Sequence, residues 1–339
     1  MSLCSIHVPR ARIVRDLPPR LDQDVMTLLL GGHMKTRLLL ILSVLGLTSS
    51  AMRAEGAKNF CKLTARTALQ SCQVAAQSDL LLAIGKCDNV ADREQREACR
   101  QQATADTREA LDQCRAQHSV RQGACPRLGG RPYDPVIDPA NFVDKIDNPY
   151  FPLVPGTNFI YEGQTSGGLV HTEFFVTHNT KQILGVTTVE VHDTVTTDGE
   201  LTEDTLDWFA QDKDGNVWYF GENTEELIGG RPSTLAGTFL AGENGARAGI
   251  IMEAHPAIGD FYRQEFDLGN AEDFGEVTSL SDTITVPAGT FTHCVKTPET
   301  TPLEPSLHEA KWYAPGVGNI LTLDLDTGEK SELIRIEFK

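Results

Sequence analysis

The chain has 339 residues, of which 40% are hydrophobic and 23% are charged, a composition typical of a folded globular protein. Its net charge of −17 disfavours the clustered cations that a nucleic-acid backbone requires, so we expect no nucleic-acid partner. No apolar run reaches the roughly 18 residues of a membrane span, and we therefore expect no stable membrane insertion.

Residues 34–54 have the order of a secretory signal peptide. Lys35 and Arg37 precede an apolar run at 38–47, and small residues follow as far as Ala54. This pattern predicts export to the periplasm or to the outside of the cell. Residues 1–33 precede the signal, and we expect them to be a misassigned leader, with translation beginning at Met34.

Six cysteines lie behind the signal at positions with mirror symmetry. The intervals between Cys61, Cys72, Cys87, Cys99, Cys114 and Cys125 are 11, 15, 12, 15 and 11 residues. Six cysteines allow fifteen connectivities, but in an antiparallel helical hairpin the positions related by a mirror face each other. We therefore predict a hairpin over 55–127, stapled by Cys61–Cys125, Cys72–Cys114 and Cys87–Cys99.

A zinc site is the alternative for these cysteines. Zinc ligands usually include pairs separated by two to four residues, and no pair here is so close, which favours disulfides. Alanines such as Ala68, Ala76 and Ala103 would allow the two helices to approach to disulfide distance. We identify no cofactor.

Prolines break the helical pattern between residues 128 and 156. The segment is a predicted linker to the next domain. Aromatic residues, including Tyr133, Phe142, Tyr150 and Phe151, alternate with the prolines, so we expect this linker to wrap onto the next domain and pack there.

Residues 157–339 read as an acidic antiparallel β domain. Short β-favouring runs are separated by turn signals, with no long helix between them. The glycine-rich stretch 229–249 is the longest irregular segment and the best candidate for a lid. The segment from Asp212 to Asn216 resembles a calcium loop but has its glycine at the wrong position, so an Asp-Gly hairpin turn explains it better.

Two stretches of this domain resemble secreted bacterial half-barrel proteins of the LolA/TapB-like kind. They are Val286–Phe291 and the Trp-Tyr-Ala-Pro-Gly-Val-Gly turn at 312–318. The stretches 207–212 and 215–222 are also similar to a family of uncharacterised secreted bacterial proteins. The half-barrel resemblance implies a curved sheet around a helix or an apolar ligand. The fold class is thus α+β: a stapled helical hairpin followed by a mainly antiparallel β half-barrel or meander.

The candidate site residues depend on which face of one predicted strand is buried. Glu203 and Asp207 share one face of this strand, and Leu206 and Trp208 share the other. If the acidic face lines the concave side, Asp207 could meet Glu265 in a carboxylate cluster for a metal or for acid-base chemistry. His171 is a possible further metal ligand.

The function with the best support from sequence is exported, non-catalytic ligand binding. We expect an apolar small molecule on the concave face, with 229–249 as a gate. The alternatives are a metal-binding protein that uses Glu203, Asp207, Glu265 and His171, and a secreted hydrolase that uses the same carboxylates. Cys294 has no predicted partner, and we expect a buried, inert thiol.

Overall fold

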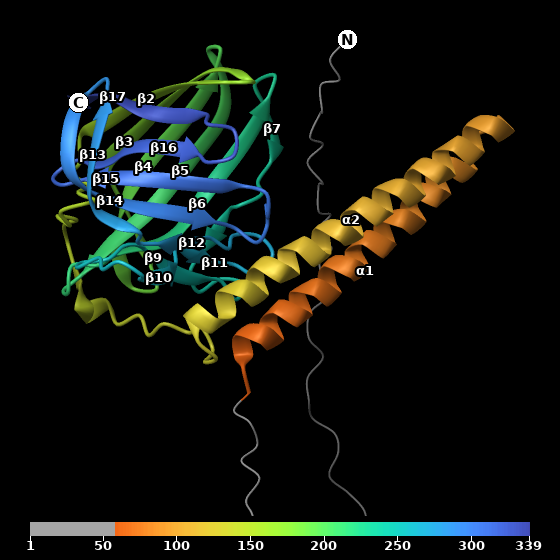
Figure 1. Ribbon diagram of the computed structural model, residues 1–339, viewed down its shortest axis with the longest axis horizontal. Coiled ribbons are helices and arrows are strands. Elements are labelled where there is room, and N and C mark those ends of the chain that lie inside the picture. The colour runs from red at the N-terminus through yellow and green to blue at the C-terminus, as the bar shows by residue number, and fades with distance from the viewer. Residues whose placement is uncertain (1–57) are drawn as a thin grey trace, which may run out of the picture. The chain divides into compact units, whose positions relative to one another are not determined.

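The computed structural model describes residues 58–339 (Figure 1). The proposed signal peptide and leader lie outside these residues, so both stay predictions. Two helices, α1 (Phe60–Asp88) and α2 (Arg93–Leu128), come first. The side chains of Asn59 and Asp92 cap them by accepting hydrogen bonds from the backbone N–H groups of Lys62 and Gln95. None of the helices in 58–339 combines the length and the apolar character of a membrane span.

All three predicted disulfides are confirmed. The Cα–Cα distances are 5.6 Å for Cys61–Cys125, 5.7 Å for Cys72–Cys114 and 5.6 Å for Cys87–Cys99. Buried alanines lie between these bridges on both helices and let the backbones approach. Disulfides of this kind are typical of proteins outside the cytoplasm.

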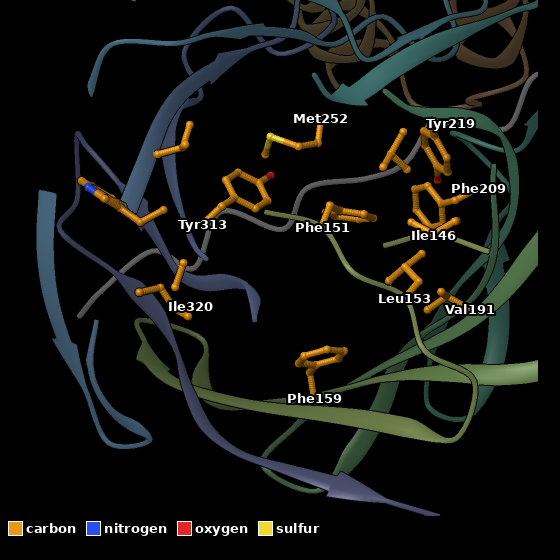
Figure 2. Close-up of a cluster of buried hydrophobic side chains, with 14 of the residues drawn as sticks. Ile146, Phe151, Leu153, Phe159, Val191, Phe209, Tyr219, Met252, Tyr313 and Ile320 are labelled. Atoms are coloured by element: carbon orange, nitrogen blue, oxygen red, sulfur yellow. The ribbon is translucent and has the colours of Figure 1, made fainter. Parts of the chain in front are cut away.

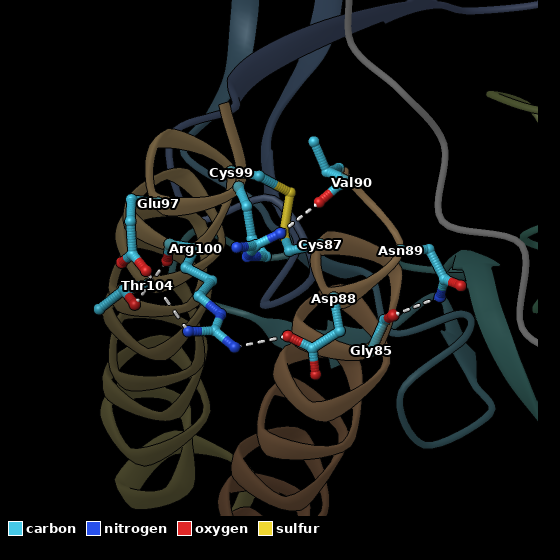
Figure 3. The surroundings of a disulfide bond; sticks show 10 residues. Gly85, Cys87, Asp88, Asn89, Val90, Glu97, Cys99, Arg100 and Thr104 are labelled. Atoms are coloured by element: carbon cyan, nitrogen blue, oxygen red, sulfur yellow. Dashed lines mark hydrogen bonds and ion pairs between the residues drawn. A yellow bond between two sulfur atoms is a disulfide. The ribbon is translucent and has the colours of Figure 1, made fainter. Parts of the chain in front are cut away.

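The turn of the hairpin lies beside the Cys87–Cys99 bridge (Figure 3). Asn89 ends α1 by donating a side-chain hydrogen bond of 2.9 Å to the carbonyl of Gly85. Arg100 on α2 reaches back to Asp88 at 2.6 Å. Helix α1 therefore continues through Gly85 and ends at Asp88.

A buried ion pair joins the base of α2 to the β domain. Arg121 donates two hydrogen bonds to one carboxylate, from Nη2 to Glu272 Oε1 at 2.6 Å and from Nε to Oε2 at 3.0 Å. Both residues are buried, with Arg121 5% and Glu272 1% exposed. In the β domain, Glu272 lies in sequence between Ala271 and Asp273.

The linker contains the short 3-10 helix η1 (Pro139–Asn141) and the first strand. The strands are β1 (Phe142–Val143), β2 (Thr157–Thr165), β3 (Gly168–Ile183), β4 (Val186–Thr197), β5 (Glu200–Asp212), β6 (Val217–Ile228), β7 (Arg231–Thr234), β8 (Phe239–Leu240), β9 (Arg247–Met252), β10 (Phe261–Arg263), β11 (Glu265–Phe266), β12 (Phe274–Glu276), β13 (Ser279–Val286), β14 (Gly289–Thr300), β15 (His308–Ala314), β16 (Gly318–Asp324) and β17 (Lys330–Phe338).

Within residues 58–339 these strands form one 17-stranded antiparallel sheet that curls into a nearly closed barrel (Figure 1). Sequential hairpins build β2 to β6 and β13 to β17. Strand β17 pairs with β2, which joins the end of the chain to the start of the domain. The pairs β6–β9, β9–β11, β10–β12 and β12–β14 carry the sheet around the other side. The predicted α+β architecture is confirmed, and the sheet curls further than a half-barrel.

Residues 146–153, which we call the strap, close one end of the barrel. Asn148, 2% exposed, donates side-chain hydrogen bonds to the carbonyls of Gly215 at 2.9 Å and Glu253 at 3.1 Å. The carbonyl of Pro149 accepts a hydrogen bond from the backbone N–H of Gly316 at 2.6 Å. The strap therefore ties together the β5–β6 turn, the β15–β16 turn and the residue that follows β9.

Candidate functional site

Strand register shows which side chains point into the barrel. Val189, Phe209 and Tyr219 pair with one another across β4, β5 and β6, and all three belong to the main core. Every second residue along a strand points to the same face, so the residues two, four or more positions away on that face also point into the barrel. Going from the strap end to the other end, this face carries Val191, Asp207 and Glu222, and then Asp193 and Glu203.

The opposite wall contributes charged residues at the same level. Thr297 pairs with Lys311 and Glu299 pairs with Glu309 on the neighbouring strands β14 and β15. Two further carboxyls, Glu265 on β11 and Asp273 directly before β12, interact electrostatically with these residues. We call the whole set the acidic cluster: Asp193, Glu203, Asp207, Glu222, Glu265, Asp273, Glu299 and Glu309.

A tyrosine links two members of the cluster. The hydroxyl of Tyr219 lies 2.5 Å from Asp207 Oδ1 and 3.1 Å from Glu222 Oε2. A β-bulge places all three on the inner face, because Phe220 is an extra residue between Tyr219, which pairs with Phe209, and Gly221, which pairs with Trp208. Only glycine fits at 221, where φ is 148° and a Cβ would lie 2.4 Å from the carbonyl oxygen of Phe239.

Lys311 is the cation among these inward-facing charges. Its Nζ lies 2.6 Å from Glu299 Oε2. The other oxygen of Glu299 accepts hydrogen bonds from Gln264 at 2.9 Å, Thr297 at 3.2 Å and Tyr313 at 3.3 Å. Burial lowers the pKa of Lys311, but attraction to Glu299 and Glu309 outweighs this effect and raises it overall. The lysine therefore stays charged and neutralises Glu299.

For the remaining carboxyls, the attraction of Lys311 and the hydrogen bonds of Tyr219 only partly offset burial. Burial, reinforced by repulsion from neighbouring carboxylates, raises the pKa of Asp193, Asp207 and Glu222 to about 8 each. Burial and the proximity of Asp273 and Glu222 also raise the pKa of Glu265 well above its usual value. Several of these groups therefore hold a proton at neutral pH.

The strap end of the barrel is apolar. Figure 2 shows Phe151 and Leu153 of the strap among side chains from several walls of the barrel, including Phe159, Phe209 and Tyr313. The ring of Phe151 lies 5.3 Å from Phe209 and 6.3 Å from Tyr313, measured between centroids. We call this region the apolar floor: Ile146, Phe151, Leu153, Phe159, Val191, Phe209, Met252, Tyr313 and Ile320.

Several inward-facing side chains above this floor are only partly buried. The side chain of Lys311 faces inward, and 29% of its surface is still exposed to solvent. Phe174 packs on the inner rings of Phe151 and Phe159 and is still only partly buried. Asp193 and Glu222 are partly buried as well. The acidic upper wall is therefore less completely buried than the apolar floor.

The structure brings together three of the four candidate metal ligands. Asp207 is sensitive to the charge of Glu203, and Glu265 to that of Asp207, so all three belong to one electrostatic neighbourhood. His171 lies apart, on the outer face of β3, where its Nδ1 is 3.2 Å from Glu162 Oε1. Among residues 58–339 no three His, Cys, Asp or Glu side chains are arranged to hold a metal ion. The metal site stays an untested prediction.

The glycine-rich stretch 229–249 is more ordered in structure than its sequence indicated. It contains β7 and β8, both of which pair with β6, and the start of β9. Phe239 is buried and packs edge-on against Tyr219, with ring centroids 5.5 Å apart. The longest exposed run is the β6–β7 turn and its flanks, from Ile228 to Ser233, and Leu235, Ala236 and residues 242–245 are exposed as well.

Two smaller expectations are confirmed. Asp212 to Asn216 form the turn between β5 and β6, where Asp212 Oδ1 accepts a hydrogen bond from the backbone N–H of Asn216 at 2.9 Å. The thiol of Cys294 is free and buried, and burial raises its pKa, which disfavours the reactive thiolate.

Comparisons with known proteins do not extend this picture. No protein-family model matches the chain, and no curated protein matches it in sequence. A solved structure of a candidate lipoprotein from Parabacteroides distasonis is similar at 16% identity and a TM-score of 0.33, covering 56% of this chain and 98% of that one. The resemblance to LolA/TapB-like half-barrels is therefore unconfirmed.

Proposed function

We propose that the protein is an exported carrier that holds a small molecule with an apolar part in its barrel and does not convert it chemically. The observation that supports this proposal is the graded interior, which is apolar and buried at the strap and carries partly exposed, inward-facing side chains such as Phe174 and Lys311 above it. Apolar surface that is only partly buried inside a fold gains free energy when a ligand covers it, at about 25 cal/mol per Å². The three disulfides are consistent with a location outside the cytoplasm.

The partial exposure of Phe174 carries the argument for an apolar ligand. Its ring faces inward between Phe151 and Phe159 and is only partly buried there, so a ligand could cover the rest of its surface. The next residue, Phe175, points to the outer face, where Lys339 Nζ lies 5.2 Å from its ring. The two phenylalanines thus form a matched pair for experiment.

The test uses N-phenyl-1-naphthylamine, a neutral apolar fluorophore, and protein stripped of endogenous lipid by solvent extraction. We expect the wild-type protein to enhance its fluorescence, the Phe174→Asp variant to lose the enhancement and the Phe175→Asp variant to keep it. Native mass spectrometry of unextracted wild-type protein from its own host should show an organic adduct. No enhancement with the wild-type protein, together with no adduct, would overturn the proposal.

A further inference from the structure

Helix α1 presents exposed apolar side chains on the side that faces away from α2. They are Phe60 at 39% exposure, Leu63 at 52%, Val74 at 65%, Leu81 at 71% and Leu82 at 61%. Within residues 93–128, the longer helix α2 exposes no large apolar side chain. At 100° per residue the five side chains fall within an arc of about 100°, and the buried alanines of α1 lie on the opposite side of the helix.

The other residues of this arc are small and uncharged. They are Thr64, Thr67, Ser71, Ser78 and Gly85. We call these ten residues the α1 face. The charged residues of α1 all lie outside the arc. A helix face that meets only water normally carries charged side chains, whereas an exposed row of large apolar residues marks a surface that binds another molecule.

Gly85 is a separate sign that something packs closely on this face. It lies inside α1, and a Cβ at this position would contact no other segment within 4 Å. Glycine inside a helix costs about 1 kcal/mol relative to alanine. No close contact within residues 58–339 requires it here. A second helix that approaches this end of the face would account for the glycine.

The charge distribution favours a second copy of this chain as the molecule that covers the face. Residues 131–339 contain 35 acidic and 12 basic residues, whereas residues 58–128 contain 8 acidic and 11 basic ones. Two copies therefore repel each other through their β domains but not through their hairpins. The α1 face adds an uncharged surface to the part of the chain where two copies can meet.

The α1 face is also complementary to itself. When two copies of α1 run antiparallel and cross between Cys72 and Gln73, each residue of the face lies opposite another residue of the face. The opposed pairs are Phe60–Gly85, Leu63–Leu82, Thr64–Leu81, Thr67–Ser78 and Ser71–Val74. Three of these pairs set a large apolar side chain against a small residue, so the two helices can interdigitate. A two-fold interface requires this kind of self-complementarity.

The size of the face indicates a reversible dimer. It extends from residue 60 to residue 85, roughly 38 Å along a helix about 10 Å wide, so its footprint is roughly 400 Å² per copy. Two such footprints lie at the weak end of specific protein interfaces. We therefore expect a dissociation constant in the micromolar range.

We infer that two copies of this chain associate through their α1 faces as an antiparallel dimer, with the acidic barrels at opposite ends. The three disulfides of each hairpin hold the face in one shape before association, which lowers the entropy cost of binding. The barrel interiors take no part in this interface, so the inference does not depend on the carrier function.

Sedimentation velocity over a range of concentrations tests the dimer. Between about 1 µM and about 200 µM the wild-type protein should change from monomer to dimer, with a dissociation constant of roughly 10 µM. Val74→Glu and Leu81→Glu should each raise this constant tenfold or more, because a dimer would bury the new carboxylates without partners. Ala105→Glu is the matched control, since Ala105 is exposed on α2, and its constant should stay within twofold of the wild type.

Gly85→Leu distinguishes close helix packing from unspecific apolar association. Leucine adds apolar surface and favours the helix, so it would strengthen an unspecific association. In the antiparallel dimer the new side chain collides with Phe60 of the second copy, and the dissociation constant should rise at least tenfold.

Three results would overturn the inference. The first is a wild-type protein that stays monomeric up to about 200 µM, even if its α1 face binds lipid vesicles or another protein. The second is a dimer that Val74→Glu and Leu81→Glu leave unchanged. The third is a dimer that Gly85→Leu strengthens.

Discussion

Replacing Asp207 by asparagine should stabilise the protein at high pH. Asp207 is 7% exposed, and burial and the nearby Asp193 raise its pKa from the usual 3.8 to about 8. The folded protein therefore binds a proton that the unfolded chain releases, and this contribution to stability is lost as pH rises from about 4 to about 8. Asparagine keeps an oxygen to accept the hydrogen bond of Tyr219 and has no charge to bury.

The two pKa values give the size of the effect. For an isolated group with pKa values of 3.8 in the unfolded chain and about 8 in the folded protein, the free energy of unfolding falls by about 4 kcal/mol between pH 5 and pH 8.5. Neighbouring carboxyls cause part of this shift and rearrange their own protons when Asp207 is neutralised. We therefore expect about half of it, roughly 2 kcal/mol.

Urea unfolding followed by tryptophan fluorescence at pH 5 and pH 8.5 measures this difference. The Asp207→Asn variant should gain roughly 2 kcal/mol relative to the wild type between the two pH values. Asp214→Asn, in the exposed β5–β6 turn, is the control and should change by less than about 0.5 kcal/mol at either pH. A wild-type-to-variant difference that is the same at pH 5 and pH 8.5 would refute the reasoning about the interior carboxyls.

Three further variants test the framework around the site. Asn148→Ala removes the donor to Gly215 and Glu253 and should destabilise the protein by roughly 2–4 kcal/mol in urea unfolding, and an unchanged midpoint would show that the strap does not depend on this side chain. Replacing Cys72 and Cys114 together by serine removes a disulfide that closes a loop with a sequence separation of 42, and it should lower the stability of the hairpin by roughly 3–4 kcal/mol. Thermal unfolding followed by circular dichroism measures this loss, and equal melting temperatures of the wild type and the variant would contradict it. Arg121→Met should cost roughly 3–5 kcal/mol by leaving Glu272 buried without its partner, and adding Glu272→Leu should recover most of the loss, so a double variant as unstable as the single one would count against the ion pair.

The helical hairpin could be predicted in detail because its pattern is local and redundant. Mirror spacing alone selected one of fifteen cysteine connectivities, and all three bridges follow it. Short alternating runs with turn signals between them were enough to predict the antiparallel sheet. Closure of the barrel was harder to predict, because it depends on pairings such as β17–β2 between segments that are far apart in the sequence.

The inner face of β5 could not be chosen from sequence, because both faces of this strand are buried. Phe209 packs in the barrel core, and Trp208 packs in a second cluster on the outer face with Ile183, Val186 and Phe220. Alternation predicts sidedness only where one face meets water. The sequence therefore left open whether Glu203 and Asp207 point inward, and the structure places them on the inner face.

Other members of the site were missed for a related reason. The bulge at Phe220 puts Tyr219 and Glu222 on one face although they are three residues apart, which conceals them from a search with period two. Lys311 and Glu299 lie on neighbouring strands and face each other only through the register of β14 and β15. Gly221 within an aromatic run was the available signal, since glycine inside a strand often marks a bulge.

The contact between Arg121 and Glu272 couples the hairpin mechanically to the barrel wall. Helix α1 has 29 residues, so the stapled pair is a stiff lever roughly 40 Å long. Tilting this lever has to drag Glu272 along or break a buried ion pair, and the adjacent Asp273 belongs to the interior charge group. A load applied at the hairpin turn is thereby delivered to the barrel wall at Glu272, next to Asp273.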